Sequence, residues 1–163
     1  MARNQLAVIP FIMHQGQPLI LMVTSRETRR WIVPKGWQEK KVKDRDQALC
    51  EAFEEAGAIG ILGDTPIGGY RYDKRLKDGR VKAIDVAVYC LEVCELLNDW
   101  PEMDERERRW MTPAQAAMAV QEGALAALLL SMAVNPPVAP VLESGNTALL
   151  PVRRIQRENR PRI

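Results

Sequence analysis

The sequence predicts an α+β fold in which helices pack on a mixed β-sheet. The predicted elements are a β-hairpin, a strand and a helix, followed by a second hairpin, strand and helix. The strands are short and rich in β-branched residues, and the helical segments carry apolar residues at intervals of three and four. Because a sheet buries its apolar faces against other elements, this order favours helices packed on it. The chain of 163 residues is long enough for one domain with a substantial core.

The first half is predicted to form a hairpin, a short buried strand and a helix. The hairpin turn falls at Gln15-Gly16-Gln17-Pro18, and Pro34 ends the short strand. Asp44 or Asp46 is predicted as the N-cap of the helix, and Gly57 suits the left-handed position at its end. The predicted strands of this half are 5–14, 19–24 and 31–33.

The second half is predicted to form another hairpin, a returning strand and a C-terminal helix. The sequence Lys77-Asp78-Gly79-Arg80 is a turn, because Asp-Gly favours tight hairpins. The helix begins with Thr112 as N-cap, Pro113 at its first position and Gln115 at its third, and Gly123 marks a break. The predicted strands are 58–62, 67–76, 81–92 and 110–111, and the helical segment is 113–132.

Composition after residue 133 divides the chain into a domain at 1–134 and a Pro/Arg-rich tail at 135–163. The three cysteines form no disulfide framework, which favours a reducing, cytoplasmic location. The N-terminus is predicted as a strand and not a signal peptide, and the apolar stretch 124–134 is too short to span a bilayer. A net charge of +2 is too small to indicate nucleic-acid binding.

The helix that ends at Gly57 carries an uncompensated acidic face. Glu51, Glu54 and Glu55 have i, i+3 and i+4 spacing, so they are neighbours on the helix surface. No Lys or Arg occurs between residues 46 and 59, and the helix dipole disfavours anions in the last turn. This pattern suggests an external hard divalent cation. The alternative is a solvated acidic face. The apolar stripe of the same helix is Leu49, Ala52, Phe53 and Ala56.

The segment 36–58 resembles the Nudix box, which reads Gly, five residues, Glu, seven residues, then Arg-Glu-apolar-any-Glu-Glu-any-Gly-apolar. Two positions depart from this pattern, because Val42 replaces the first Glu and Cys50 replaces the Arg that helps to orient the glutamates in the family. Glu39 lies close enough in the loop to stand in as an acid. The matching residues are Gly36, Glu51, Ala52, Glu54, Glu55, Gly57 and Ala58.

The flanking sequence is similar to the Nudix branch that contains diphosphoinositol polyphosphate phosphohydrolases. The similar segments are 23–26, 30–36 and 95–102, followed by Arg106, Arg108, Arg109 and Trp110, and the resemblance covers about residues 5–133. It implies a Nudix-type α/β/α sandwich with a mixed β-sheet.

The resemblance also implies a pyrophosphohydrolase that depends on Mg²⁺, or on Mn²⁺ in its place. The implied metal ligands are Glu51, Glu54, Glu55 and the Gly36 carbonyl, and the same three glutamates are the implied catalytic residues. A divalent ion would bridge acids and phosphates and lower the pKa of the attacking water. One of the glutamates or a distal acid would accept the proton of the water, and the distal candidates are Asp85, Glu102 and Glu105.

Basic residues near the box are the candidates for substrate binding. Arg26, Arg30, Lys35 and Lys41 could bind a polyphosphate chain, although each could equally serve solubility. We expect a polyphosphate-rich substrate such as a dinucleoside polyphosphate or a diphosphoinositol polyphosphate. The alternatives are a hydrolase of ADP-ribose or a nucleotide sugar, and a non-catalytic nucleotide-binding domain. The expected partner is a phosphorylated small molecule, with neither a membrane nor a nucleic acid involved.

Overall fold

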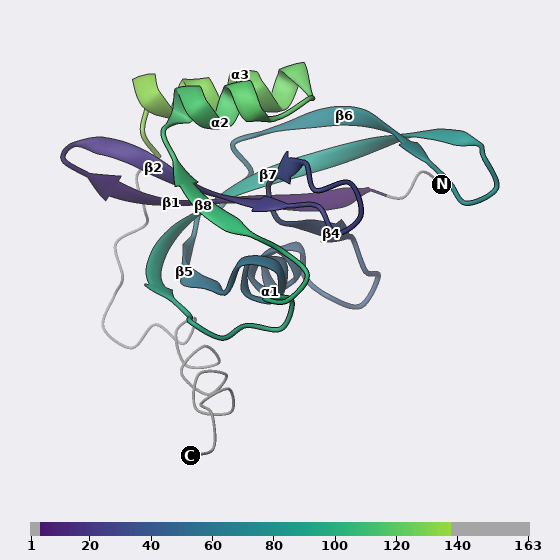
Figure 1. Cartoon of the computed structure of the whole chain (residues 1–163), viewed down its shortest axis with the longest axis horizontal. Coiled ribbons are helices and arrows are strands. Elements are labelled where there is room, and N and C mark those ends of the chain that lie inside the picture. Colours follow the sequence, from purple (N-terminus) through teal and green to yellow (C-terminus); the bar gives the residue numbers. More distant parts are fainter. Residues whose placement is uncertain (1–3, 138–163) are drawn as a thin grey trace, which may run out of the picture.

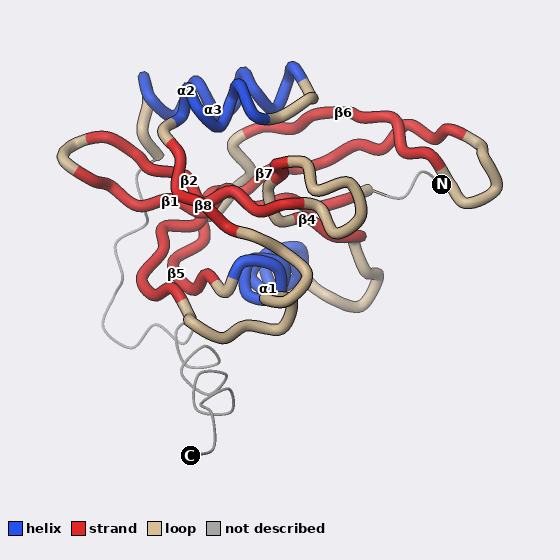
Figure 2. Tube along the Cα trace, viewed as in Figure 1, coloured by secondary structure: helices blue, strands red, loops and turns tan. Residues whose placement is uncertain are grey.

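The computed structural model describes residues 4–137 and places one mixed sheet between two helical layers (Figure 1). Figure 2 shows the strands as a central layer with α1 on one side and α2 and α3 on the other. This arrangement confirms the predicted fold class. The elements in chain order are β1 (Gln5–His14), β2 (Gln17–Thr24), β3 (Trp31–Ile32), β4 (Lys35–Trp37), α1 (Asp44–Ala56), β5 (Ala58–Leu62), β6 (Gly68–Arg75), β7 (Val81–Leu96), β8 (Arg108–Met111), α2 (Pro113–Ala119) and α3 (Gly123–Val134).

The sheet joins the two halves of the chain through a parallel pair at its centre. The strand order is β3-β2-β1-β7-β5, with β4 also paired to β1, β6 to β7 and β8 to β2. Strands β1 and β7 are parallel, whereas the other pairs are antiparallel. The single parallel pair makes the sheet mixed and places β4 and β7, which are distant in the sequence, on opposite sides of β1.

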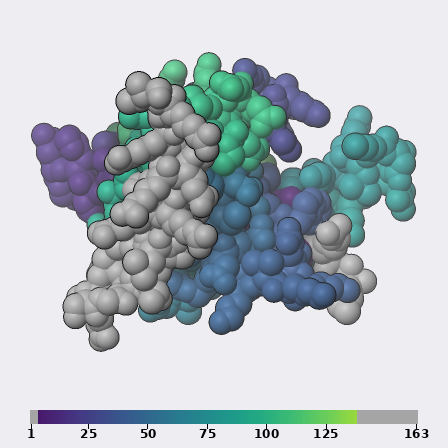
Figure 3. All heavy atoms as spheres, turned by 90° about the horizontal axis from the view of Figure 1, so that it is seen from below, coloured from purple at the N-terminus to yellow at the C-terminus, as the bar shows by residue number. Residues whose placement is uncertain are grey.

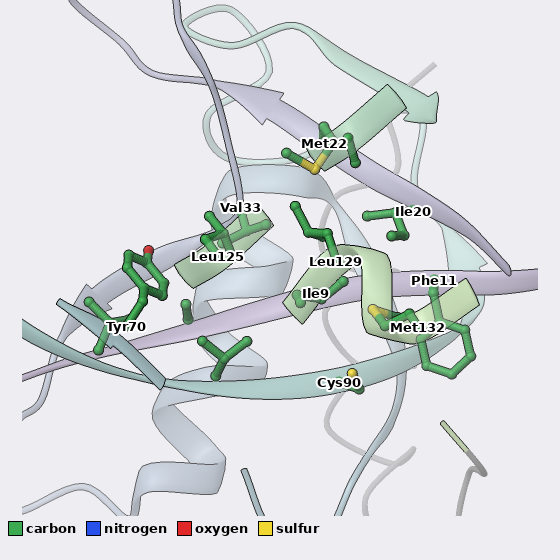
Figure 4. Packing of buried hydrophobic residues seen from close by; sticks show 14 of the residues in the cluster. Ile9, Phe11, Ile20, Met22, Val33, Tyr70, Cys90, Leu125, Leu129 and Met132 are labelled. Carbon is green, nitrogen blue, oxygen red and sulfur yellow. The ribbon is translucent and has the colours of Figure 1, made fainter. Parts of the chain in front are cut away.

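Side-chain alternation along the central strands divides the core into two layers. In β1, Leu6 and Val8 face α1, while Ala7, Ile9 and Phe11 face α2 and α3. Burial on both sides explains why this strand is continuously apolar rather than alternating. Figure 4 shows the second layer, in which side chains of α3 meet those of β1, β2 and β7. The α3 residues in that layer are Leu125, Leu129 and Met132.

The hairpin of β6 and β7 projects beyond the rest of the sheet (Figure 1). Strand β1 pairs with β7 only from Val86 onward, so residues 71–85 form a two-stranded ribbon. Alternate side chains of this ribbon are exposed, and Asp85 pairs with Arg71 on it, with 2.8 Å between carboxylate oxygen and Nε. The ribbon therefore stands outside the helical layers.

Several boundaries differ from those predicted. Helix α1 has Lys43 as its N-cap without a side-chain hydrogen bond, so the predicted capping by Asp44 or Asp46 is wrong. Strand β4 was not predicted, and it forms because residues 35–37 pair with β1. The break near Gly123 is confirmed, as is the capping box of Thr112.

A tail is predicted at 135–163, and its residues after 137 lie outside the described part of the chain. Between residues 4 and 137, no helix has the length and apolar character needed to cross a membrane.

Candidate active site

Helix α1 packs closely on the sheet because the residues in the interface are small. Ala48, Ala52 and Ala56 are fully buried against the layer formed by β1, β2 and β5. This close approach draws the neighbouring acids inward, so Glu51 is 9% exposed and Glu55 is 6% exposed. The alternative of a solvated acidic face is therefore wrong for these two residues. The predicted apolar stripe also shifts, because Leu49 and Phe53 are only partly buried.

Gly36 and Glu51 form the contact between β4 and α1. A Cβ atom added to Gly36 would lie 1.9 Å from Oε1 of Glu51, so only glycine leaves room for the carboxylate. Gln47 donates to the same oxygen at 2.6 Å. Burial is the main cause that raises the pKa of Glu51, and the nearby Glu54 and Glu102 add to the effect. Glu51 is thus a buried carboxylate whose hydrogen-bond donor is neutral.

Glu55 lies between the backbone of β4 and an arginine from the other half of the chain. Its Oε2 accepts from the Lys35 amide at 3.2 Å, and its Oε1 accepts from Arg106 Nη2 at 3.2 Å. Burial nevertheless dominates and raises the pKa of Glu55 to about 8, against the opposing effect of Arg106. A carboxyl group with this pKa can exchange a proton near neutral pH.

Arg106 supplies a cation that local sequence inspection missed. Its side chain is 6% exposed and also donates to Glu102 Oε1, with Nη2 at 3.1 Å. Although α1 has no basic residue beside its acids, the loop before β8 brings one to Glu55. The external cation inferred from the sequence is therefore not needed for Glu55 alone. It remains a hypothesis for Glu51 and Glu54.

The three distal acids proposed as proton acceptors lie in different parts of the structure. Glu102 interacts electrostatically with both Glu51 and Glu55, so it belongs to the same cluster. Asp85 lies on the projecting ribbon, and Glu105 is exposed, with its backbone carbonyl accepting from Arg29. Glu102 is thus the distal candidate that lies beside the helix acids.

The segment 97–108, which is the loop between β7 and β8 together with the first residue of β8, closes the C-terminal end of α1. In Figure 3 green atoms from this part of the chain adjoin the blue atoms of α1. The Glu54 carbonyl accepts from the Glu102 amide at 3.1 Å, and the Glu55 carbonyl accepts from Trp100 Nε1 at 3.1 Å. The Ala56 carbonyl accepts from Arg108 Nη1 at 2.8 Å. Helix ends leave such carbonyls without intrahelical partners. Side chains and backbone of this loop satisfy them and hold Glu102 beside the acids.

The two positions that depart from the Nudix pattern have different environments. Cys50 is exposed, and its thiol donates to Glu54 Oε1 at 3.3 Å. Burial of part of the side chain and this hydrogen bond raise the pKa of Cys50 to about 12, so the thiol stays neutral. Val42 is 36% exposed in the loop before α1. Neither residue supplies charge to the cluster.

The acidic cluster has the donor chemistry of a magnesium site, because carboxylate oxygens are the ligands that hard divalent ions prefer. Among residues 4–137, no three His, Cys, Asp or Glu side chains converge into a formed metal site. The contacts explain this, since Glu51, Glu54 and Glu55 each turn towards a different partner. The donor set fits a divalent cation, and its assembly remains a prediction.

The four predicted substrate-binding residues do not lie together. Arg26 is 3.7 Å from Glu102 Oε1 and 59% exposed, which places it at the rim of the acidic cluster. Arg30 donates to Gln121 in the connection between the C-terminal helices. The Lys35 ammonium lies 4.3 Å from the Tyr72 ring centre, and its backbone amide reaches Glu55. Lys41 is exposed in the loop before α1.

The raised pKa of Glu55 predicts how stability depends on pH in the absence of divalent ions. The unfolded carboxyl titrates near 4.5 and the folded one at about 8. Its contribution is therefore fully present below pH 4.5 and is lost as the pH rises towards 8. We expect the free energy of unfolding of the wild type, relative to Glu55→Gln, to decrease over this range. Urea denaturation at several pH values measures the difference, and a constant difference would contradict the raised pKa.

Comparison with known proteins gives relatives over much of the described domain. No protein-family model matches the chain. Nudix hydrolase 12, mitochondrial, of Arabidopsis thaliana is 36% identical over 100 residues, covering 60% of this chain and 49% of that protein. Diphosphoinositol polyphosphate phosphohydrolase 3-beta of Bos taurus is 31% identical over 121 residues, covering 73% of this chain and 70% of that protein. The chain spans about half the length of the plant relatives it matches.

Solved structures share the fold at much lower sequence identity. A C. elegans Ap4A hydrolase in a binary complex has a TM-score of 0.62 and 16% identity, covering 82% of this chain and 96% of that chain. The E. coli dihydroneopterin triphosphate pyrophosphohydrolase has a TM-score of 0.62 and 15% identity, covering 81% of this chain and 95% of that chain. At this identity the likeness supports the fold alone.

Proposed function

Because this chain belongs to the Nudix hydrolase family, we propose that it is a metal-dependent hydrolase that cleaves a pyrophosphate bond in a polyphosphate-rich substrate. The substrate class that we favour is a dinucleoside polyphosphate or a diphosphoinositol polyphosphate. The diphosphoinositol polyphosphate phosphohydrolase relatives and the exposed Arg26 beside Glu102 support this choice.

One observation carries the proposal, namely an acidic cluster whose charge the chain offsets only in part. Glu51 is buried beside Gly36 with a neutral donor, although a buried carboxylate is costly unless a charge compensates it. Glu54 is next to it and has a neutral thiol as donor. Arg106 serves Glu55 and Glu102 on the other side of the cluster. A divalent cation at Glu51 and Glu54 would supply the missing positive charge.

The proposed roles follow from these positions. Glu51, Glu54 and the Gly36 carbonyl, with Glu55 next to them, would hold Mg²⁺ or Mn²⁺. The ion, when bound, neutralises phosphate oxygens and lowers the pKa of a water molecule. Glu55 is suited to accept the proton of the attacking water, because it lies beside the proposed ligands and its contact with Arg106 stabilises the carboxylate form that a base requires. Arg26, at the rim, would bind a phosphate group that does not react.

Phosphate release across a substrate panel tests this function. The panel contains a dinucleoside polyphosphate, a diphosphoinositol polyphosphate, ADP-ribose and a nucleotide sugar, each with and without Mg²⁺. We expect Mg²⁺-dependent release from one of the first two. Release only from ADP-ribose or the nucleotide sugar would replace the proposed substrate class. Absence of release from every substrate would contradict the proposed hydrolase.

A non-catalytic nucleotide-binding domain is the second candidate, favoured by Val42 and Cys50 at the two positions that depart from the Nudix pattern. Cys50→Arg would restore the Nudix residue beside Glu54. Tight ligand binding without turnover in the wild type, together with turnover in Cys50→Arg, would support this candidate. Measurable wild-type turnover would exclude it.

Substitution of Arg26 is predicted to affect substrate binding more than chemistry. A charge-assisted contact to phosphate contributes about 1.5–3 kcal/mol, so Arg26→Met should raise KM at least about tenfold with kcat nearly unchanged. Steady-state kinetics measures both constants. The matched control is Arg75→Met, because Arg75 is exposed on the projecting hairpin. An equal effect of both substitutions on KM would indicate a general charge effect and not a phosphate site.

A further inference from the structure

Arg106 is held more tightly than any of the basic residues predicted to bind substrate. Its residue exposure is 8%, and each nitrogen of its guanidinium group donates to a protein oxygen. Nε and Nη2 bind Glu102 at 3.3 and 3.1 Å, Nη2 binds Glu55 at 3.2 Å, and Nη1 binds the Thr24 carbonyl at 3.0 Å. One guanidinium group therefore connects α1, the end of β2 and the loop before β8.

The planar shape of the guanidinium group determines what these contacts achieve. Its donors have fixed relative directions, so it can set the distance and angle between two carboxylates. The Thr24 carbonyl in turn fixes the guanidinium relative to the sheet. A lysine would keep the charge, but its ammonium is a single point on a flexible stem. The arrangement depends on an arginine and not merely on a cation.

The contacts also argue against a direct role in substrate binding. Because Nε, Nη1 and Nη2 already donate to protein oxygens, Arg106 has little donor capacity left for a phosphate group. Arg26 contacts the same Glu102 oxygen from the exposed side, at 3.7 Å. Glu102 thus separates an exposed arginine at the rim from the buried one.

We propose that Arg106 is a positioning residue that fixes the carboxylates of Glu55 and Glu102 relative to each other, and that turnover depends on this geometry. The role rests on the proposed hydrolase function. The cation that positions these acids comes from the loop before β8, 51 residues along the chain from Glu55, and not from α1 itself. Order in this loop and order in the acidic cluster are therefore linked.

Arg106→Lys tests this role, because it preserves the positive charge and removes the planar guanidinium group with its fixed donor directions. The matched control is Arg109→Lys, a neighbouring exposed residue whose guanidinium lies 5.2 Å from the Trp31 ring centre. We expect Arg106→Lys to lower kcat at least about tenfold and to change KM less than about threefold. Arg109→Lys should leave both kcat and KM unchanged. A rise in KM with kcat unchanged would assign Arg106 to substrate binding and overturn the proposal, as would unchanged kinetics.

Mn²⁺ binding to the substrate-free protein gives a readout independent of activity. Arg106→Lys conserves charge, so any change in Mn²⁺ affinity would come from the altered positions of the Glu55 and Glu102 carboxylates. We expect the Kd for Mn²⁺, measured by electron paramagnetic resonance, to rise at least about threefold. An unchanged Kd would count against the role even if the wild type proved inactive, so the two proposals can fail separately.

A double-substitution cycle with Glu102→Gln completes the test, and circular dichroism first establishes that each variant is folded. If Arg106 acts through Glu102, the double variant should lose little more kcat than the worse single variant. Losses that multiply would overturn the proposal. Should Arg106→Lys fail to fold, Glu102→Gln alone decides by the same kcat and Mn²⁺ criteria.

Discussion

Glu54→Gln is expected to lower kcat about 10²- to 10⁴-fold without unfolding the protein. Glu54 is only partly buried, and the Cys50 thiol donates to its side chain. The amide of glutamine conserves size but is a much weaker ligand for a divalent cation than a carboxylate. The loss should therefore fall on metal-dependent turnover. Initial rates at increasing Mg²⁺ concentrations measure it, and excess Mg²⁺ should restore part of the rate.

The control for this substitution is Glu95→Gln. Glu95 is exposed near the end of β7, opposite Ile59 of β5, and takes no part in the acidic cluster. Glu95→Gln changes the net charge by the same amount as Glu54→Gln does. If Glu54→Gln kept wild-type turnover, Glu54 would not be a ligand, and the proposed metal site would have to be abandoned.

Gly36→Ala is expected to have the second large effect. The new methyl group would lie 1.9 Å from Oε1 of Glu51, so the carboxylate must leave its position or β4 must move from α1. Overpacking of this kind costs about 1–3 kcal/mol of stability. A displacement of about 1 Å at a catalytic group can cost roughly 10²-fold in rate. We therefore expect kcat to fall much more than thermal stability does.

Gly123→Ala is the matched control, because a Cβ atom at Gly123 would meet nothing within 4 Å. Gly123 begins α3 on the other side of the sheet, where alanine is compatible with a helix. Thermal unfolding and kcat are measured for both variants. Full activity in Gly36→Ala would show that the position of Glu51 does not matter for turnover.

The sequence was sufficient for features that depend on local spacing. The order of the strands and helices other than β4, the turn at Asp78-Gly79 and the capping box of Thr112 each follow from residues close together in the chain, and the structure confirms them. The acids of α1 could be grouped for the same reason, since helical geometry alone places Glu51, Glu54 and Glu55 on neighbouring surface positions.

Features that depend on distant pairing could not be predicted. Arg106, Arg108 and Arg109 belong to one charged run, and nothing local distinguishes them. Their positions follow from the loop after Trp100 and from β8, which pairs antiparallel with β2. Strand β4 is a further example, because its three residues include glycine and its pairing is with β1. The burial of Glu51 also depends on how closely alanines bring α1 to the sheet.

The closure of α1 by the loop at 97–108 has a consequence for local unfolding. Carbonyls of the last turn of α1 accept hydrogen bonds from this loop. The donors include the Glu102 backbone amide and Trp100 Nε1. Detaching the loop would expose these carbonyls together and release Arg106 from Glu55. Loop and helix end should therefore behave as one cooperative unit in amide hydrogen exchange, and the acids would lose their arrangement in that same opening event.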